Sequence, residues 1–292
     1  MKNSLIEILN ETLKIINCGY YDTSGHQAVL QDLQINKQDF SKAIYYSESE
    51  VDKCVQSVKE LNNYRVHLLD ECNYSVVNTD SFSAAKSLIE KYPSKKVMVL
   101  NFANPFNPGG GVRIGAVAQE EDLCRKSTLL ASLESDDAKI YYDVHNKSKN
   151  YFSSNAILVS ENVEVFRDQN NKLLEKSFIV SVLTCAAPYI RYSEDYCKTH
   201  REEYEKLIYD RIFGILSVAQ KYTDILVLGA WGCGAFCNDA RLIANTFKKC
   251  LSEINILSFD MDGATAFQDV VFAVLDKFGN GYNITEFKKV FG

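Results

Sequence analysis

Apolar side chains recur at helical spacing near the start of the chain. In residues 4–17 and again in residues 48–61, aliphatic side chains lie three or four positions apart. This pattern predicts two amphipathic helices, each packing one face on a larger body. From residue 63 onward the pattern changes to short apolar runs rich in β-branched residues, which are typical of buried strands. The predicted strands cover residues 64–69, 74–78, 97–102, 156–159, 178–184, 225–229 and 270–275.

Helical windows separate several of these strands, and this alternation predicts an α/β fold with a mostly parallel sheet. The chain has only four prolines, no low-complexity tract and no repeat, so no flexible linker is expected. We therefore expect residues 1–62 to form an extension packed on one core of residues 63–292. Residues 141–154 show no period and are expected to form a long surface loop. The predicted helices cover residues 81–92, 118–133, 194–222 and 239–254, the last with Asn238 or Asp239 as N-cap.

The composition is that of an ordinary globular protein. Of 292 residues, 46% are hydrophobic and 24% are charged, which excludes disorder and collagen-like repeats. The 32 basic and 38 acidic residues give a formal net charge of -6. A general affinity for DNA or RNA needs clustered basic residues, so no nucleic-acid partner is expected. An anionic ligand would have to be bound locally.

The nine cysteines are scattered along the chain, without any CxxC pair. An odd total without paired spacing argues against a disulfide framework and indicates a reducing compartment. The first helix contains Glu7 and Glu11, which a secretory signal would not tolerate, and no apolar stretch reaches the roughly 18 residues of a membrane span. We expect no membrane partner and a cytoplasmic location, or a nuclear one if the source is a eukaryote.

Two glycine-rich loops follow predicted strands. Residues 101–121, NFANPFNPGGGVRIGAVAQEE, follow one strand, and residues 229–236, GAWGCGAF, follow another. In open α/β sheets such loops bind ligands, because free backbone N–H groups and positive helix ends accept an anion there. Three consecutive glycines indicate a backbone shape, or a close approach by a ligand, that a Cβ would forbid. The two loops together suit a diphosphate, while for Gly232 and Gly234 a simple tight turn is an equal alternative.

The commoner catalytic motifs are absent from the sequence. There is no GK[ST] sequence, and residues 232–237 meet the GxGxxG pattern except at its last position, which disfavours a P-loop enzyme or a dinucleotide dehydrogenase. No HExxH, GxSxG or Cys/His metal spacing occurs, and the four histidines are dispersed. We therefore expect no metal and no cofactor.

Gln119, Glu120 and Glu121 remain as the acid/base candidates, at the end of the triple-glycine loop. Acidic residues are common in the first turn of a helix, so a solvated helix start is the alternative interpretation. Successive helical residues diverge by about 100°, so one carboxylate can face a reaction centre while the other holds a neighbouring hydroxyl. A second carboxylate nearby raises the pKa of a partly buried one, which suits a general acid.

These residues resemble those of the microbial-type poly(ADP-ribose) glycohydrolases, whose signature is GGG, six to eight residues, and then QEE. Here seven residues separate Gly111 from Gln119. The FAN segment that ends at Asn104 and the GCGAF segment at residues 232–236 also resemble that family. The resemblance implies a macrodomain-like three-layer α/β/α core with a mixed, mostly parallel sheet and an N-terminal helical extension. Cys237 stands where relatives commonly have glycine.

The resemblance also implies an activity and a role for each matching residue. The substrate would be poly(ADP-ribose) or an ADP-ribosylated protein, and ADP-ribose would be the product, released by hydrolysis of ribose–ribose O-glycosidic bonds without a cofactor. Glu121 would be the general acid and base, and Glu120 would orient the distal ribose. The end of the strand at residues 270–275 would contact the adenine. The substrate-binding residues would be Asn104 and Phe236 at the distal ribose, Gln119, and, around the diphosphate, Gly109, Gly110, Gly111, Gly232, Cys233, Gly234 and Ala235.

Two alternatives use the same site. A non-catalytic reader of ADP-ribosylated proteins needs only the glycine loops, and a hydrolase of single ADP-ribose groups needs the same residues as the polymer enzyme.

Overall fold

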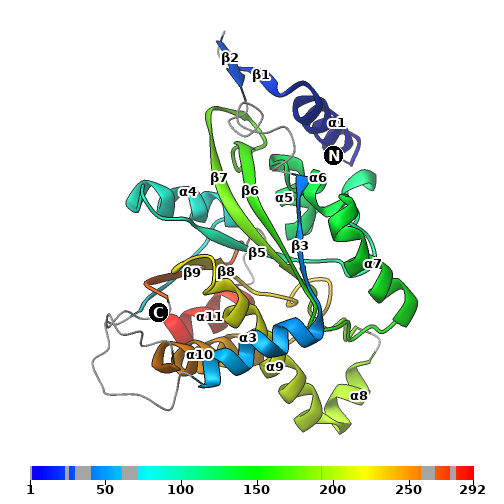
Figure 1. Ribbon diagram of the computed structural model, residues 1–292, viewed down its shortest axis with the longest axis vertical. Coiled ribbons are helices and arrows are strands. Elements are labelled where there is room, and N and C mark those ends of the chain that lie inside the picture. The colour runs from blue at the N-terminus through cyan, green and yellow to red at the C-terminus, as the bar shows by residue number, and fades with distance from the viewer. Residues whose placement is uncertain are drawn as a thin grey trace.

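A mixed seven-stranded sheet forms the centre of the computed structural model (Figure 1). The structure describes residues 2–23, 26–29, 41–60, 72–191, 193–257, 267–276 and 281–292. In spatial order the strands are β3 (Ile44–Tyr46), β6 (Ile157–Arg167), β7 (Leu173–Cys185), β5 (Met98–Phe102), β8 (Ile225–Leu228), β9 (Asp269–Ala273) and β4 (Asn73–Val77).

Neighbouring strands are parallel from β7 across to β4, whereas β6 runs antiparallel to both β7 and β3. In the register of β5 with β7, Asn101 lies beside Thr184. The carboxyl ends of β5, β7, β8 and β9 therefore share one edge of the sheet, where α/β folds place their ligands. This arrangement confirms the predicted mostly parallel sheet.

Helices cover both faces of the sheet, as the alternating side chains of β5 require. Met98 and Leu100 join the core on one face, and Val97 and Val99 join the core on the other. The first face carries α3 (Glu48–Glu60), α9 (Arg201–Ala219), α10 (Ala240–Leu257) and α11 (Tyr282–Phe291). The second carries α1 (Lys2–Cys18), α4 (Ser81–Lys91), α5 (Gln119–Lys126), α6 (Leu129–Leu133) and α7 (Asp136–Ser148).

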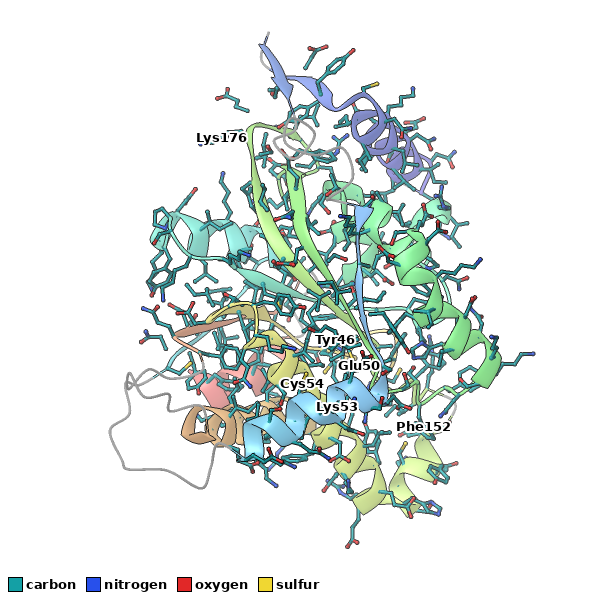
Figure 2. The ribbon with its side chains drawn as sticks, in the orientation of Figure 1. Tyr46, Glu50, Lys53, Cys54, Phe152 and Lys176 are labelled. Atoms are coloured by element: carbon teal, nitrogen blue, oxygen red, sulfur yellow. The ribbon has the colours of Figure 1, made fainter. Side chains whose placement is uncertain are left out.

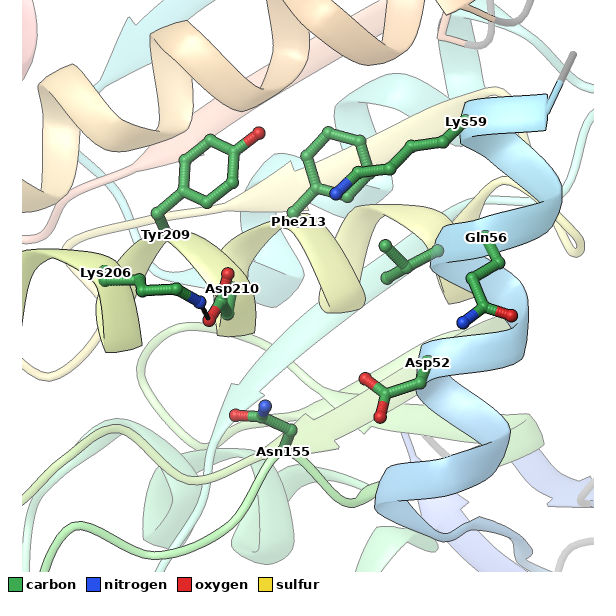
Figure 3. A pocket seen from close by; sticks show the side chains of 9 residues that line it. Asp52, Gln56, Lys59, Asn155, Lys206, Tyr209, Asp210 and Phe213 are labelled. Carbon is green, nitrogen blue, oxygen red and sulfur yellow. Dashed lines mark hydrogen bonds and ion pairs between the residues drawn. The ribbon is translucent and has the colours of Figure 1, made fainter. Parts of the chain in front are cut away.

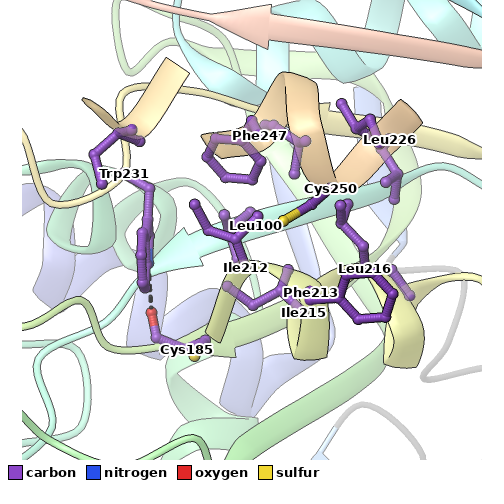
Figure 4. Close-up of a cluster of buried hydrophobic side chains, with 14 of the residues drawn as sticks. Leu100, Cys185, Ile212, Phe213, Ile215, Leu216, Leu226, Trp231, Phe247 and Cys250 are labelled. Carbon is purple, nitrogen blue, oxygen red and sulfur yellow. Dashed lines mark hydrogen bonds between the residues drawn. The ribbon is translucent and has the colours of Figure 1, made fainter. Parts of the chain in front are cut away.

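Trp231 anchors the loop after β8 in the first of these cores (Figure 4). Its ring is fully buried near Leu100, Ile212 and Phe247, and its Nε1 donates a hydrogen bond of 3.0 Å to the carbonyl of Cys185. The bond satisfies the one polar atom of a large buried ring. The bond also ties the loop after β8 to the end of β7 and fixes their relative position.

The N-terminal helix packs on the segment that follows the triple glycine. The hydroxyl of Thr12 on α1 donates to the carbonyl of Arg125 on α5 at 2.6 Å. A Cβ at Gly115, which has φ 73°, would lie 2.8 Å from the carbonyl oxygen of Lys2, so glycine is required where the two segments touch. The separation of residues 1–62 from residues 63–292 stays a prediction, although β3, within the first range, is a strand of the central sheet.

The prediction of a long surface loop over residues 141–154 is wrong for its first half. Helix α7 extends to Ser148 and begins behind Ser135, whose hydroxyl accepts from the Ala138 N–H. Ala138, Tyr141, Tyr142 and His145 form its buried face. Two tyrosines and a histidine carry the helical period here, and a pattern based on aliphatic residues does not register them.

Other element boundaries also differ from the sequence prediction. The helix predicted over 118–133 is divided into α5 and α6 at Ser127, which bridges to Val165 of β6. The helix predicted over 194–222 is divided into α8 (Glu194–Thr199) and α9, with His200 between them. The predicted strand at 64–69 lies outside the described residues. The pattern missed β1 (Tyr20–Thr23), β2 (His26–Val29), β3 and α11.

All nine cysteines are free, and Cys124, Cys185, Cys197 and Cys250 are buried. Among the described residues, no helix is long and apolar enough to cross a bilayer.

Candidate active site

The triple glycine wraps around the two glutamates that begin α5. Gly109 and Gly110 have φ values of 67° and 58°, in the left-handed region that favours glycine. A Cβ at Gly110 would lie 2.6 Å from Oε1 of Glu121 and 3.1 Å from Oε2 of Glu120. Both carboxyl groups therefore converge on this glycine. The sequence pairing of GGG with QEE is thus a direct spatial contact.

Each carboxyl oxygen of Glu120 accepts a hydrogen bond from a protein donor. Its side chain is buried, its Oε2 accepts from the Asn104 N–H at 2.7 Å, and its Oε1 accepts from Nδ2 of Asn101 at 3.2 Å. Burial raises the pKa of Glu120 from 4.5 to about 8, and these hydrogen bonds lower it only in part. Burial therefore favours the neutral, protonated form of Glu120.

Glu121 has one anchored oxygen and one without a partner. Oε1 accepts from the Gly111 N–H at 2.8 Å. Oε2 is buried and has no hydrogen-bond partner in the described part of the chain. Native structures rarely leave a buried carboxylate oxygen unpaired, so such an atom calls for a functional explanation. The Oε2 atom of Glu121 is therefore available to form a hydrogen bond with a ligand.

Gln119 binds protein groups with both ends of its amide. Oε1 accepts from the Phe102 N–H at 2.9 Å, and Nε2 donates to the Leu100 carbonyl at 2.8 Å and to the Ser81 hydroxyl at 3.1 Å. These bonds fix the start of α5 against the end of β5. The contact of Gln119 with the substrate stays a prediction. In the structure, its hydrogen bonds hold the first turn of α5 and thereby position Glu120.

Asn104 shapes the turn that precedes the glycines. Its Oδ1 accepts from the N–H groups of Phe106 at 2.8 Å and Asn107 at 3.0 Å, while its own N–H binds Glu120. The residue therefore couples the loop conformation to the carboxyl pair. These hydrogen bonds of the turn do not involve the Nδ2 of Asn104. This amide nitrogen can therefore donate a hydrogen bond to a ribose hydroxyl.

The second glycine loop contains two glycines with different surroundings. Gly232 has φ 75°, and a Cβ there would lie 2.5 Å from the Cβ of Ala187. Asn238 closes this turn, since its Nδ2 donates to the carbonyls of Gly232 at 3.0 Å and Pro188 at 2.8 Å. A Cβ at Gly234, in contrast, would meet no atom of the described residues within 4 Å. The tight-turn interpretation thus accounts for Gly232 but not for Gly234.

Cys237 ends the second loop with φ 65°. The left-handed conformation is strained for a residue with a Cβ, which explains a preference for glycine at this position. The next residues start α10, where the Asp239 carboxylate accepts from the Arg241 N–H at 3.0 Å. The predicted cap at Asp239 is confirmed, and the positive end of α10 lies directly behind the loop.

A cavity of about 770 Å³ lies between the start of α5 and the second glycine loop. Asn104, the triple glycine and the two glutamates lie beside it and are not among the residues that line it. Gln119 and Asp122, which flank the glutamates, line it together with Gly234 and Phe236. Small-molecule sites usually measure about 300 to 1,000 Å³, so the space fits a nucleotide-sized ligand. Val274 and Leu275 line the same cavity, at the place where the sequence analysis expected the adenine. Cys233 and Ala235 belong to the same loop, and Ala235 also lines the cavity.

A smaller cavity of about 280 Å³ lies between α3 and α9 (Figure 3). Its wall includes Asp52, Lys206 and Asp210, and the last two form an ion pair with each other. None of the predicted site residues contributes to it. We therefore place the candidate site in the larger cavity.

The sequence analysis missed Asn101. This residue is fully buried at the end of β5, and its Nδ2 donates to Glu120 and to the Thr184 hydroxyl, each at 3.2 Å. The signal was a polar residue inside the apolar run VMVLNF, since a buried side-chain amide needs hydrogen-bond partners. Its Nδ2 has two partners, and its Oδ1 has none among the described residues. No group of three His, Cys, Asp or Glu residues within the described ranges could hold a metal ion.

The chain is similar to known proteins in sequence and in structure. The sequence profile of the family described as microbial-type PARG, catalytic domain, matches residues 10–168, more than half of the chain. No curated protein matches the chain significantly.

Solved structures match most of the chain. The poly(ADP-ribose) glycohydrolase of Thermomonospora curvata is 30% identical, with 99% of this chain and 100% of that chain covered and a TM-score of 0.85. A second structure of that enzyme, bound to the inhibitor ADP-HPD, gives 30% identity, 98% and 99% coverage and a TM-score of 0.84. The poly(ADP-ribose) glycohydrolase of Deinococcus radiodurans in complex with ADP-ribose is 30% identical, with 85% and 92% covered and a TM-score of 0.73.

Proposed function

The chain belongs to the family of microbial-type poly(ADP-ribose) glycohydrolases, and from this premise we propose how its residues carry out the reaction. It is a glycosidase that hydrolyses the ribose–ribose O-glycosidic bonds of poly(ADP-ribose) and releases ADP-ribose. We propose the polymer, free or attached to protein, as the substrate in the cell. Nucleic acids and membranes are not partners in this proposal.

The unpaired Oε2 of Glu121 is the observation that carries the mechanism. In the proposal this oxygen protonates the departing ribose oxygen, while the Gly111 N–H holds Oε1 and fixes the orientation of the carboxyl group. When the departing ribose leaves as an alcohol, the distal ribose becomes an oxocarbenium-like ion. The negative charge of the substrate diphosphate stabilises this ion. The Glu121 carboxylate then removes a proton from the attacking water.

Glu120 and Asn104 orient the distal ribose in this mechanism. Glu120 is neutral at neutral pH because burial raises its pKa to about 8, so its carboxyl group can both donate to and accept from sugar hydroxyls. A neutral Glu120 also leaves the negative charge on Glu121 once that residue has given up its proton. Asn101 acts through Glu120, because its amide fixes Oε1.

The glycine loops bind the rest of the nucleotide. We infer that the diphosphate lies between Gly111 and Gly234, against backbone N–H groups and the positive end of α10. The open space at Gly234 supports this inference, since no protein atom of the described residues requires glycine there. Phe236 would pack on the distal ribose, and Val274 and Leu275 would contact the adenine.

Incubation of the purified protein with labelled poly(ADP-ribose) tests the proposal. We expect the wild-type protein to release ADP-ribose, and the Glu121→Gln variant to bind ADP-ribose without releasing it from the polymer. Binding without release by the wild-type protein would identify a reader instead. Release from a singly ADP-ribosylated peptide but not from the polymer would identify a hydrolase of single groups.

A further inference from the structure

Four aromatic rings form a continuous row beside the candidate site. The ring centroids of Phe106 and Tyr151 are 6.4 Å apart, those of Tyr151 and Tyr189 6.0 Å, and those of Tyr189 and Phe236 5.1 Å. The first and last contacts are edge-to-face, with interplanar angles of 81° and 84°. We call this row the aromatic rim. Its members come from four separate loops and meet only in the folded protein.

The sheet topology explains why these loops meet. Phe106, Tyr189 and Phe236 follow β5, β7 and β8, whose carboxyl ends share one edge. Tyr151 precedes β6, and because β6 is antiparallel to β7 its start lies at that same edge. Figure 2 labels Phe152, the neighbour of Tyr151, at this edge and Lys176 of β7 at the opposite end of the molecule.

Backbone hydrogen bonds fix the rim before any ligand arrives. The Tyr189 N–H donates to the Tyr151 carbonyl at 2.8 Å, and the Ile190 N–H donates to the Phe236 carbonyl at 3.1 Å. The amide of Asn146 on α7 donates to the Phe106 carbonyl at 2.9 Å. A surface that is already ordered loses little conformational entropy when it binds a ligand. Tyr151 nevertheless remains 56% exposed, so its ring is accessible to a ligand.

The rim adjoins the reaction centre at both of its ends. Phe236 lines the nucleotide cavity. Phe106 donates its N–H to the side chain of Asn104, whose own N–H binds Glu120. The rim thus spans from the predicted distal-ribose contact to the turn that holds the carboxyl pair. In the proposed function the distal ribose lies at Phe236 and at the Asn104 turn, which places the group attached to its anomeric carbon beside the rim.

We propose that the aromatic rim binds the adenine of the departing unit of poly(ADP-ribose), stacked on Tyr151. This inference rests on the proposed function. In the polymer, the departing oxygen belongs to a ribose that carries its base on the adjacent carbon, so this base lies close to the scissile bond. Aromatic rings bind bases of any sequence by stacking. An ADP-ribose group attached to a protein side chain has no base there, so the rim favours the polymer over singly modified proteins.

Calorimetry on the Glu121→Gln variant, which binds without turnover, tests the proposal. The two probes are ADP-ribose and its 1''→2' linked dimer. We expect the added substitution Tyr151→Ala to weaken dimer binding about tenfold and to leave ADP-ribose binding unchanged, as removal of one stacking ring does. Tyr151→Phe keeps the ring and should restore the dimer affinity. Equal effects on both probes, or no effect on either, would overturn the proposal.

Tyr20→Ala serves as the matched control, because Tyr20 is 43% exposed on β1, at the far end of the molecule (Figure 1). It should change neither affinity. The activity of the wild-type protein on the polymer distinguishes a failure of the proposed function from a failure of the rim proposal alone. If it releases no ADP-ribose from the polymer, the proposed function and the rim proposal both fail. If it releases ADP-ribose while Tyr151→Ala leaves dimer affinity unchanged, only the rim proposal fails.

Discussion

The two glycine loops of this protein differ in what occupies the space next to their glycines. At Gly110 a Cβ would collide with the Glu121 carboxylate, and at Gly109 it would lie 2.7 Å from Leu130. At Gly234, in the second loop, the same space is open. The first loop is therefore shaped around the carboxyl groups of Glu120 and Glu121, whereas Gly234 in the second loop borders a space that no described residue fills. In our proposal the two glycine motifs therefore have different roles, catalysis in the first loop and ligand binding in the second.

The largest expected effect tests the first loop alone. Glu121→Gln removes the proton donor but keeps the shape of the side chain, so we expect turnover to fall about 10² to 10⁴-fold. The ADP-ribose dissociation constant should stay within about threefold, because in our proposal backbone N–H groups, and not the Glu121 side chain, bind the diphosphate. Steady-state kinetics and calorimetry measure the two quantities. A parallel loss of binding and turnover would erase the difference between the loops.

Glu120 provides a stability test of the same loop. Because its pKa is about 8 in the folded protein and near 4.5 when unfolded, the folded state holds more protons between these pH values. The free energy of unfolding contributed by this residue is therefore full below pH 4.5 and is lost as the pH rises through 8. The side chain of Glu120→Gln does not titrate, so this loss is absent in the variant. The free energy of unfolding of the variant, relative to that of the wild type, should therefore rise by on the order of 3 kcal/mol between pH 5 and pH 8.

Urea unfolding at both pH values measures this gain. The exposed Glu202, substituted in the same way, is the control and should show no such pH-dependent difference. A difference between Glu120→Gln and wild type that does not change with pH would contradict the burial-driven proton at Glu120.

Substitutions at the two glycines of the second loop should have different effects, on stability at Gly232 and on ligand binding at Gly234. Gly232→Ala should destabilise the protein by roughly 2 to 3 kcal/mol, because the Cβ would meet Ala187 and φ is positive. Gly234→Ala should leave the melting temperature nearly unchanged and weaken ADP-ribose binding about tenfold or more, because the methyl group enters the ligand space. Thermal unfolding and calorimetry distinguish the two. Normal ADP-ribose binding by Gly234→Ala would show that the open space has another purpose.

The smallest effect is expected at the end of that loop. Cys237→Gly relieves a left-handed conformation and should stabilise the protein by about 0.5 to 1 kcal/mol, after the greater freedom of glycine in the unfolded chain is counted. Cys237→Ala retains the Cβ and should give no such gain. Equal stability of the two variants in chemical denaturation would argue against strain at this position.

The sequence predicted the elements whose apolar residues repeat with a clear period. The strands at β5, β8 and β9 and the glycine loops that follow two of them were found within a residue or two. Helix α7 was not, because its buried face is made of tyrosines and a histidine as well as alanine. Strand β3 has three residues and depends on its pairing with β6, a partner more than a hundred positions away.

The candidate site was predictable in composition but not in detail. The GGG and QEE motifs identify Glu120 and Glu121, and the structure adds which oxygen is bound and which is unpaired. Spacing along the chain cannot reveal this difference, because it depends on how the Gly111 N–H points after folding. The role of Asn101 and the aromatic rim likewise arise from contacts between segments that are distant in sequence.

A crystal structure of the Glu121→Gln variant with the ADP-ribose dimer bound would show whether residue 121 reaches the scissile bond. The measured quantity is the distance from the side-chain amide at position 121 to the glycosidic oxygen between the two ribose rings. We predict a hydrogen-bond distance, about 2.6 to 3.2 Å, from the atom that replaces Oε2. A glycosidic oxygen that lies beyond reach of this atom and within reach of Glu120 would contradict it.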